Sequence, residues 1–318
     1  MRAFPFRLLN SSVNFCMSLG FLNINKPAGM SSHDVVGFVR HLLPRGVKVG
    51  HLGTLDPGAC GVLPVAVGWA TRTIQYFPPN SKSYRAEVAF GTSTDTDDAH
   101  GEVIKTSDVP ALSVGDIESC CRRFLGRFEQ IPPRVSAIHV EGRRAYYLSR
   151  EGADFEMTPR EVFFHKISVL SYENGRALID VECGPGTYIR SFARDLGSML
   201  GCCAHLSFLL RTRSGSFVLD SACALEDLRA FGLEPYLEPV EEVLEEALGR
   251  KAFVEGKNFQ GNQEFRRVWD EEGKICSLGE ISQAWPVFER SSGRFIGVGT
   301  AVRRGGGASA LRLERLLV

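Results

Sequence analysis

Residues 50–65 read GHLGTLDPGACGVLPV, and the interpretation of the whole chain depends on them. Asp56 is the only carboxylate in this glycine-rich stretch. Pro57 holds Asp56 out of the helical region, and the glycines permit turns and the close approach of a large ligand. The apolar run Val62–Val67 predicts a buried strand that ends at Gly68 and supports the loop. We therefore expect a loop that presents the Asp56 carboxylate; the alternative is a plain Asp-Pro-Gly turn between strands.

The longer string resembles the catalytic motif of the tRNA pseudouridine synthase B family, GH-x-G-T-L-D-P-x-A-T-G-V-L-P-V. The resemblance continues through GWATR at residues 68–72. It implies that Asp56 is the essential catalytic residue. Cys60 stands where the family usually has threonine, and because the side chain stays small we expect this departure to affect packing and not chemistry.

The composition describes a globular chain of 318 residues, 44% hydrophobic and 23% charged, with no net charge. This length predicts one large domain and a small one. Zero net charge argues against a nucleic-acid-binding protein, which usually carries a basic excess. However, acidic residues concentrate between residues 234 and 246, and arginines cluster elsewhere. We expect these clusters to face phosphate: Arg122-Arg123, Arg143-Arg144, and Arg211 with Arg213.

The cysteine pattern favours reduced thiols in the cytoplasm. The nine cysteines are odd in number and contain no C-x-x-C and no zinc-like spacing with histidine. Asp95, Asp97 and Asp98 resemble a cation loop at first, but the further ligands of an EF-hand are absent. The sequence therefore predicts neither a metal site nor a cofactor.

The N-terminal residues 1–16 lack the long apolar core of a secretory signal. A weak organelle-targeting segment is one interpretation, and a dispensable extension is the one we favour. No apolar stretch approaches the roughly 20 residues that a membrane span needs.

Residues 25–32, NKPAGMSS, resemble the family's first motif, D-K-P-x-G-x-T-S. Ser32 is a candidate cap for a helix whose apolar residues recur at helical spacing: Val35, Val36, Val39, Leu42 and Leu43. This helix is expected to pack beside the catalytic loop. Lys26 has two open interpretations, a contact with RNA phosphate or a solvated loop lysine.

Residues 82–98 combine an alternating run that predicts a strand, Arg85–Phe90, with a polar loop that follows it. They resemble the family's K-x-Y and G-x-x-T-x-T-x-D elements in order and spacing. The resemblance implies that Tyr84 stacks on the target base, whereas a tyrosine at the start of a strand is usually a residue at the edge of the core.

Residues 130–152 resemble the family block Q-x-P-P-x-x-S-A-x-K-x-x-G-x-R-A-Y. His139 replaces the common lysine, so a phosphate contact there would depend on pH. The alternative is a basic connecting loop without a specific role.

Two strand-like runs, residues 162–172 and 176–183, flank Asn174-Gly175 and predict a hairpin. A helix with one apolar face follows, formed by Ile189, Phe192, Ala193, Leu196 and Leu200.

Residues 183–217 as a whole resemble the family's third motif. The resemblance implies that Arg190 pairs with Asp56, that Tyr188 lines the base pocket and that Leu209 packs against the flipped nucleotide. Leu210 replaces an arginine that many members have, which would remove some electrostatic hold on RNA.

The C-terminal residues 231–318 differ in character. Residues 238–248 predict a solvated acidic helix, and residues 253–316 predict short strands with glycine turns, whose core candidates are Val268-Trp269, Trp285 and residues 295–299. Arg303-Arg304 and the glycines after them are a candidate basic turn. Position and size resemble, weakly, the family's small RNA-binding domain of the PUA kind. We expect an extension at 1–16, a catalytic domain at 17–230 and a PUA-like domain at 231–318.

The resemblance implies an α+β fold with a central mixed, largely antiparallel sheet flanked by helices, and a β-rich C-terminal appendage. It also implies isomerisation of uridine 55 in the tRNA T-loop to pseudouridine without a cofactor or metal. The base would be flipped out of the loop, and His51 would fill the vacated space. We expect a cytoplasmic monomer whose partner is tRNA, with no membrane and no obligate protein partner. The alternatives are a guide-dependent pseudouridine synthase and a tRNA-folding chaperone.

Overall fold

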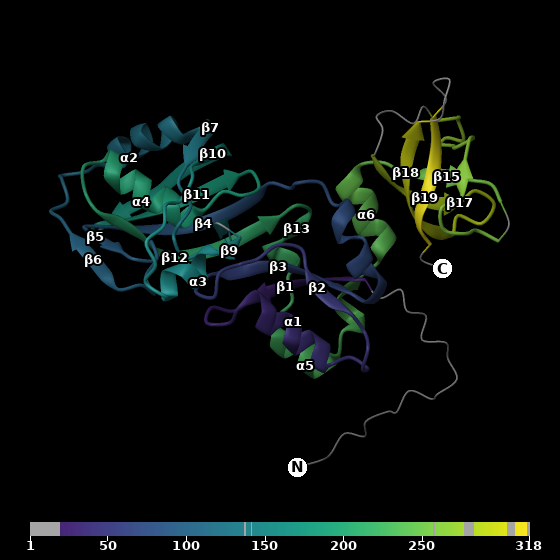
Figure 1. The fold of residues 1–318 in the computed structure, drawn as a ribbon, viewed down its shortest axis with the longest axis horizontal. Helices are drawn as coiled ribbons and strands as arrows, with labels where there is room; N and C mark the ends of the chain where they lie inside the picture. The colour runs from purple at the N-terminus through teal and green to yellow at the C-terminus, as the bar shows by residue number, and fades with distance from the viewer. Residues whose placement is uncertain are drawn as a thin grey trace, which may run out of the picture.

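The computed structural model describes residues 20–136, 138–140, 142–256, 258–276, 283–303 and 309–316. The expected extension at residues 1–16 lies outside these ranges. Within them, no helix is long and apolar enough to cross a membrane. The architecture combines a large mixed sheet with helices and a smaller C-terminal sheet (Figure 1). The predicted α+β class is therefore confirmed.

The large sheet runs in the order β14-β1-β3-β12-β4-β11-β10-β7, with β2 beside β3 and β13 beside β12. Its strands pair antiparallel except β12 and β3, which are parallel. The mixed, largely antiparallel sheet is therefore confirmed. The strands are β1 (Phe21–Lys26), β2 (Val49–His51), β3 (Cys60–Val67), β4 (Lys82–Phe90), β7 (Gly126–Gln130), β10 (Arg160–Glu173), β11 (Arg176–Cys183), β12 (Ala204–Ser214), β13 (Phe217–Val218) and β14 (Leu237–Glu238).

The helices cover the sheet in two groups (Figure 1). Helices α2 and α4 pack over one end of the sheet, where four aromatic rings interlock: Phe124, Phe128, Phe164 and Phe192. Helices α1 and α5 lie near β1 and β2. The helix bounds are α1 (Ser32–His41), α2 (Val114–Cys121), α3 (Ala145–Arg150), α4 (Ile189–Met199), α5 (Leu225–Phe231) and α6 (Val240–Leu248).

The N-cap of helix α1 lies one residue before the expected cap, Ser32. Ser31 is the N-cap, because its hydroxyl accepts from the Asp34 amide while the Asp34 carboxylate accepts from the Ser31 amide. Ser32 is buried in the first turn. The prediction that Ser32 caps the helix was therefore wrong by one position.

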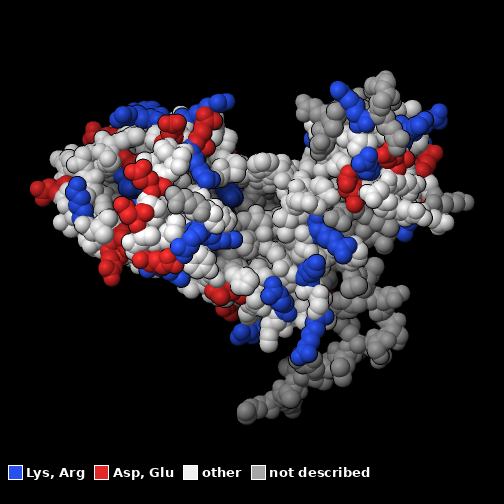
Figure 2. All heavy atoms as spheres, viewed as in Figure 1, with Lys and Arg blue, Asp and Glu red and all other residues white. Residues whose placement is uncertain are grey.

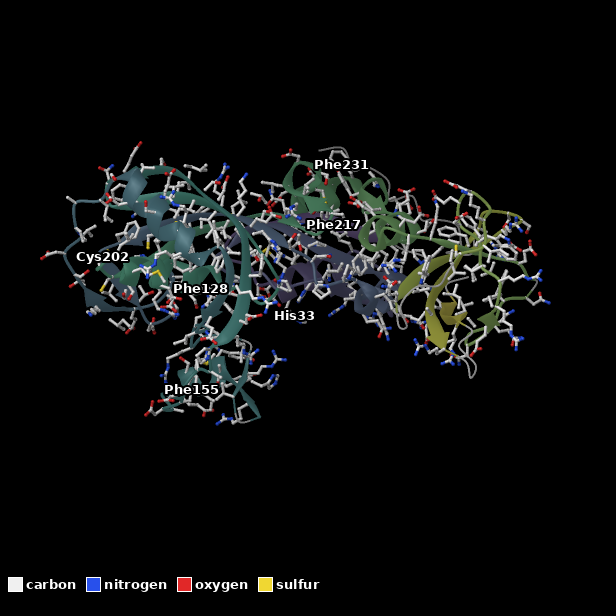
Figure 3. All side chains as sticks on the ribbon, turned by 90° about the horizontal axis from the view of Figure 1, so that it is seen from above. His33, Phe128, Phe155, Cys202, Phe217 and Phe231 are labelled. Atoms are coloured by element: carbon white, nitrogen blue, oxygen red, sulfur yellow. The ribbon has the colours of Figure 1, made fainter. Side chains whose placement is uncertain are left out.

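Short hairpins extend from the sheet. Strands β5 (Thr92–Thr94) and β6 (Val103–Thr106) form one, and β8 (His139–Val140) and β9 (Arg143–Arg144) form another. The second hairpin and α3 belong to the segment between β7 and β10. Figure 3 shows this segment, marked by Phe155, projecting away from the main body. His139 is exposed on this segment.

The C-terminal sheet has the order β15-β17-β18-β19-β16. Its strands are β15 (Ala252–Val254), β16 (Glu264–Phe265), β17 (Ala284–Glu289), β18 (Phe295–Arg303) and β19 (Ser309–Leu316). Of the core candidates, Val268 and Ile296 are buried, while Trp285 is partly buried. The possible basic turn after Arg303 lies outside the described residues.

Helix α6 differs from the solvated helix that its acidic residues predicted. Val240, Val243 and Leu244 are buried in an apolar cluster that also contains Phe21 of β1 and Val298 of β18. The glutamates occupy the other face. Since residues of both sheets meet at this helix, α6 joins the C-terminal sheet to the large one.

Candidate active site

A cavity of about 250 Å³ opens at the middle of the large sheet. It lies where the loop before β3, the start of β4, the middle of β12 and the N-terminus of α4 meet. Its lining is Thr54, Leu55, Asp56, Lys82, Tyr84, Ser136, Gly186, Thr187, Tyr188, Ile189, Arg190 and Leu209. The structure thus brings together five of the seven predicted site residues, namely Asp56, Tyr84, Tyr188, Arg190 and Leu209.

The loop that carries Asp56 is fixed by hydrogen bonds on both sides. Ser32 of α1 donates its hydroxyl to the carbonyl of Leu55 (2.9 Å) and accepts from the Leu55 amide (2.8 Å). The Gly29 amide donates to the Pro57 carbonyl (2.8 Å). The first motif therefore supports the catalytic loop directly, and the Asp56 side chain keeps 40% of its surface exposed toward the cavity.

Arg190 at the start of α4 holds the Asp56 carboxylate. Its Nε donates to Asp56 Oδ2 at 2.9 Å, and its side chain is only 6% exposed. Its Nη1 donates to the carbonyls of Thr96 (3.0 Å) and Val135 (3.1 Å). The pairing that the resemblance implied is present, and the same guanidinium also joins two loops from distant parts of the chain.

A second carboxylate, Asp98, lies 3.7 Å from the Nε of Arg190 through its Oδ2 atom. Sequence reasoning treats Asp98 only as part of a possible cation loop and does not predict its place beside Arg190. The available signal was its position inside the G-x-x-T-x-T-x-D element. Among the described residues no group of acidic, histidine or cysteine side chains is arranged to hold a metal ion.

Tyr188, the N-cap of α4, is positioned through its backbone. The buried Gln130 accepts from the Tyr188 amide (2.8 Å) and donates to the Tyr188 carbonyl (3.0 Å). Burial raises the pKa of the Tyr188 phenol. The glutamine of the Q-x-P-P block therefore fixes the backbone at the edge of the cavity, a role that sequence reasoning did not assign.

Tyr84 and Lys82 face the cavity from β4. Burial raises the pKa of Tyr84 to about 12, so its phenol keeps its proton at neutral pH. Burial lowers the pKa of Lys82, and the charge of Arg211 lowers it further. Lys82 was missed as a site residue, although the K-x-Y pattern contained it.

Two predicted site residues do not line the cavity. Lys26 is fully buried, and its Nζ donates to the carbonyls of Pro27, Met30 and Pro57. The phosphate contact considered for Lys26 is therefore wrong: the ammonium faces backbone carbonyls and not solvent. His51 is half-buried on β2, and its Nδ1 atom has no hydrogen-bond partner. His51 is not among the residues that line the cavity.

Comparison with known families identifies the family of this chain. The N-terminal domain of TruB family pseudouridylate synthases matches residues 40–189, and the C-terminal domain of tRNA pseudouridylate synthase B matches residues 190–245. These ranges contain the catalytic loop, Tyr84 and Arg190. The chain belongs to the TruB family of pseudouridylate synthases.

The relatives of this TruB family chain include proteins named tRNA pseudouridine synthase B. The protein from Symbiobacterium thermophilum is 53% identical over 66% of this chain and 71% of its own length. The protein from Heliobacterium modesticaldum is 47% identical over 66% of this chain and 69% of its own length. The fold also resembles a solved Cbf5-Nop10-Gar1 complex, with 26% identity, a TM-score of 0.67, and coverage of 95% of this chain and 86% of the other.

Cys60 shows how this TruB family member accommodates its departure from the usual threonine. The thiol donates to the Leu209 carbonyl at a sulfur–oxygen distance of 3.6 Å, and burial raises the pKa of the thiol. Cys60 thus keeps a small protonated donor behind the cavity wall.

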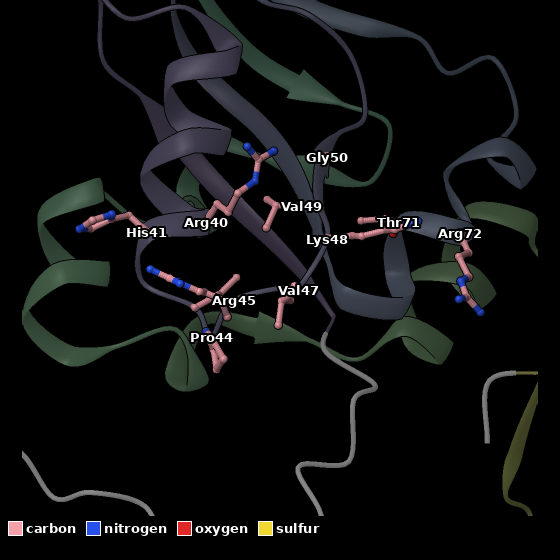
Figure 4. Close-up of a pocket in the computed structure, with 12 residues that line it drawn as sticks. Arg40, His41, Pro44, Arg45, Val47, Lys48, Val49, Gly50, Thr71 and Arg72 are labelled. Atoms are coloured by element: carbon pink, nitrogen blue, oxygen red, sulfur yellow. The ribbon is translucent and has the colours of Figure 1, made fainter.

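A second, more open hollow of about 890 Å³ lies between the end of α1, β2 and the 3₁₀ helix Gly68–Arg72 (Figure 4). Its lining contains five basic side chains and no carboxylate: Arg40, His41, Arg45, Lys48 and Arg72. Figure 2 shows Lys and Arg spheres with little acid over this part of the molecule. We call this feature the basic hollow.

Proposed function

We propose that the chain is a stand-alone tRNA pseudouridine synthase that isomerises uridine 55 of the T-loop. The observation that carries this proposal is the Asp56–Arg190 ion pair, 2.9 Å long, at a cavity that Tyr84 and Leu209 also line. The name of the relatives, tRNA pseudouridine synthase B, supports tRNA as the substrate, and one of them is 53% identical to this chain.

The reaction requires no redox agent. The bond between uracil N1 and ribose C1′ breaks, a bond between C5 and C1′ forms, and one hydrogen leaves C5 while N1 gains one. Atoms and electrons therefore balance within the nucleotide. The demands on the protein are a carboxylate at the sugar, a group that orients it, and walls that retain the detached base.

The side chains of the cavity meet these demands. Arg190 orients Asp56, because its Nε donates a charge-assisted hydrogen bond to the carboxylate. Tyr84 stacks on the base and acts as a hydrogen-bond donor and not as a ready base, since its pKa is about 12. Leu209 supplies an apolar wall against the flipped nucleotide.

The size of the site supports base flipping. A cavity of about 250 Å³ accommodates one nucleotide and not a folded RNA loop, so the target uridine leaves the T-loop stack before it reacts. His51 belongs to β2, which leads directly into the catalytic loop. In the proposed complex its imidazole occupies the space that the base leaves.

The basic hollow provides a surface for the RNA backbone. None of the ion pairs among the described residues engages Arg40, Arg45 or Lys48, so these charges remain available for phosphate. Lys48 precedes Asp56 by eight residues, which limits their Cα separation to about 28 Å. An RNA arm whose loop reaches Asp56 can therefore place phosphates in the hollow.

The guide-dependent alternative has structural support, because the Cbf5 complex has a similar fold. The higher identity to proteins named tRNA pseudouridine synthase B favours independent action on tRNA. The two functions differ in one requirement, since a guide-dependent enzyme needs a guide RNA and protein partners before it modifies anything.

The experiment uses the purified full-length chain and an unmodified tRNA transcript. Carbodiimide labelling followed by mass spectrometry maps pseudouridine along the product. We expect modification of uridine 55 alone, none in a transcript with cytidine there, and none with Asp56→Asn, which still binds tRNA within about tenfold, or roughly 1.4 kcal/mol. Inactivity of the wild-type chain without added partners would refute the proposal, and so would turnover by Asp56→Asn.

A further inference from the structure

Arg211 was expected to face RNA phosphate together with Arg213, but the structure places it inside the protein. Its side chain is fully buried, although arginine is among the residues least often found there. In the part of the chain that the structure describes, its hydrogen-bond partners are uncharged: three backbone carbonyls and the Tyr84 hydroxyl. Since a buried charge is costly unless its hydrogen bonds are satisfied, this arginine must be compensated locally.

The compensation comes from backbone carbonyls around the catalytic loop. Arg211 Nε donates to the Val62 carbonyl at 2.7 Å, Nη1 to Thr54 at 3.1 Å and Nη2 to Gly53 at 3.2 Å. One planar guanidinium therefore joins the segment before Asp56 to the strand after it. A lysine ammonium donates from a single nitrogen, so it cannot reach three carbonyls that Nε, Nη1 and Nη2 contact from separate positions of the guanidinium plane.

The position of β12 explains why this residue reaches the loop. Strand β12 lies between β3, which follows the loop, and β4, which carries Tyr84. Arg211 pairs in register with Gly61 on β3 and with Tyr84 on β4. Gly61 has φ +103°, and a methyl group there would lie 2.2 Å from the Arg211 carbonyl oxygen, so glycine allows the two backbones to meet.

We propose that Arg211 is a positioning residue of the active site, which fixes the 53–62 segment so that Asp56 faces the reacting sugar and Tyr84 faces the base. Arg211 itself has no path to the substrate. It acts through the carbonyls that it holds and through the neighbouring Tyr84 hydroxyl. The influence of its charge on the pKa of Tyr84, Lys82 and His51 agrees with a central place beneath the site.

This inference rests on the proposed function, and its test separates the two. The variants are Arg211→Lys, which keeps the charge but loses the planar guanidinium, and Arg211→Met, which has a side chain of similar length without charge. The matched control is Arg85→Met, because Arg85 also lies in the sheet beside Tyr84 but donates outward to Asp180. Every protein is the full-length chain, checked for folding by circular dichroism and thermal midpoint.

The first readout is single-turnover pseudouridine formation at saturating tRNA, with tRNA affinity measured in parallel. We expect Arg211→Lys to slow the chemical step by about 100-fold, the effect of a misplacement of about 1 Å, while affinity changes less than about threefold. Arg85→Met should keep the wild-type rate. A loss of stability alone would reduce the fraction of active molecules and not the rate of those that bind tRNA.

The second readout needs no RNA. Hydrogen–deuterium exchange of the peptide that contains residues 53–62 should accelerate in Arg211→Lys and not in Arg85→Met. The exchange measurement remains informative if the wild-type chain has no activity on tRNA. In that case the proposed function fails, while the positioning of the loop by Arg211 is still measured. A folded Arg211→Lys variant with wild-type rate and exchange overturns the inference. Failure of both Arg211 variants to fold also overturns it, because Arg211 would then support the fold as a whole.

Discussion

Ser32 and Leu55 are joined by two hydrogen bonds, one in each direction, through a single hydroxyl. The serine donates to the leucine carbonyl and accepts from the leucine amide, as a neighbouring strand residue would. This arrangement fastens the first turn of α1 to the residue before Asp56. Orientation of the carboxylate therefore depends on a contact from a helix that has no catalytic group of its own.

Replacing Ser32 by alanine should lower the rate of pseudouridine formation more than it lowers tRNA affinity. Both backbone groups of buried Leu55 would lose their partner, at a cost of about 1 to 3 kcal/mol each when unsatisfied. The matched control is Ser31→Ala, which removes the cap of the same helix at a cost of about 1 kcal/mol but leaves Leu55 paired. Equal single-turnover rates for the two variants would contradict the role of Ser32.

Replacing Arg190 by lysine should reduce turnover by more than about tenfold while tRNA affinity changes little. Arg190 donates to Asp56, Thr96 and Val135 at once, and one lysine ammonium cannot reproduce that geometry. Single-turnover rate, affinity and thermal midpoint should be measured together. A folded lysine variant with the wild-type rate would show that the ion pair is dispensable for catalysis.

The affinity for tRNA should fall steeply as salt concentration rises, despite zero net charge. If the basic hollow contacts phosphate, the double variant Arg45→Ala/Lys48→Ala should flatten the slope of log affinity against log salt by about 2. Arg176→Ala, which removes an exposed arginine paired with Glu87, is the control and should leave the slope unchanged. An unaltered slope in the double variant would exclude the hollow from the RNA path.

Stability should decline in mild acid partly because of His51. Burial lowers the folded-state pKa of His51 below its ordinary value of 6.5. Between the two values the unfolded chain binds more protons, so this contribution is complete above pH 6.5 and is lost as pH falls below it. Urea unfolding at pH 7.5 and 5.5 should show a smaller loss for His51→Gln than for wild type. Equal losses would mean that His51 titrates normally in the folded protein.

Local sequence patterns were sufficient to predict the strands, turns and helices that depend on local interactions. The apolar run after the catalytic loop is β3, and Asn174 and Gly175 turn between β10 and β11 with positive φ angles of 49° and 74°. The apolar spacing of residues 189–200 is that of α4, which ends at Met199. The resemblance to the family also predicted the ion pair of Asp56 and Arg190, which the structure contains.

The residues that were misplaced are those whose environment arises from tertiary structure. Lys26 and Arg211 are of residue types that usually lie at the surface. No sequence pattern indicates that backbone carbonyls from other segments surround them. Two adjacent serines fit the cap of α1 equally well by sequence. Only the position of Leu55 shows which of them faces the loop.

The link between Arg211 and the catalytic loop also has a consequence for folding. Arg211 and Thr54 are 157 residues apart in the chain. At a synthesis rate of about 5 to 20 residues per second, roughly 8 to 30 s separate their emergence from a ribosome. The catalytic motif is thus made early but cannot reach its final geometry until β12 enters between β3 and β4. Pairings of such sequence separation form slowly, so competence for catalysis arises late in the folding of the sheet.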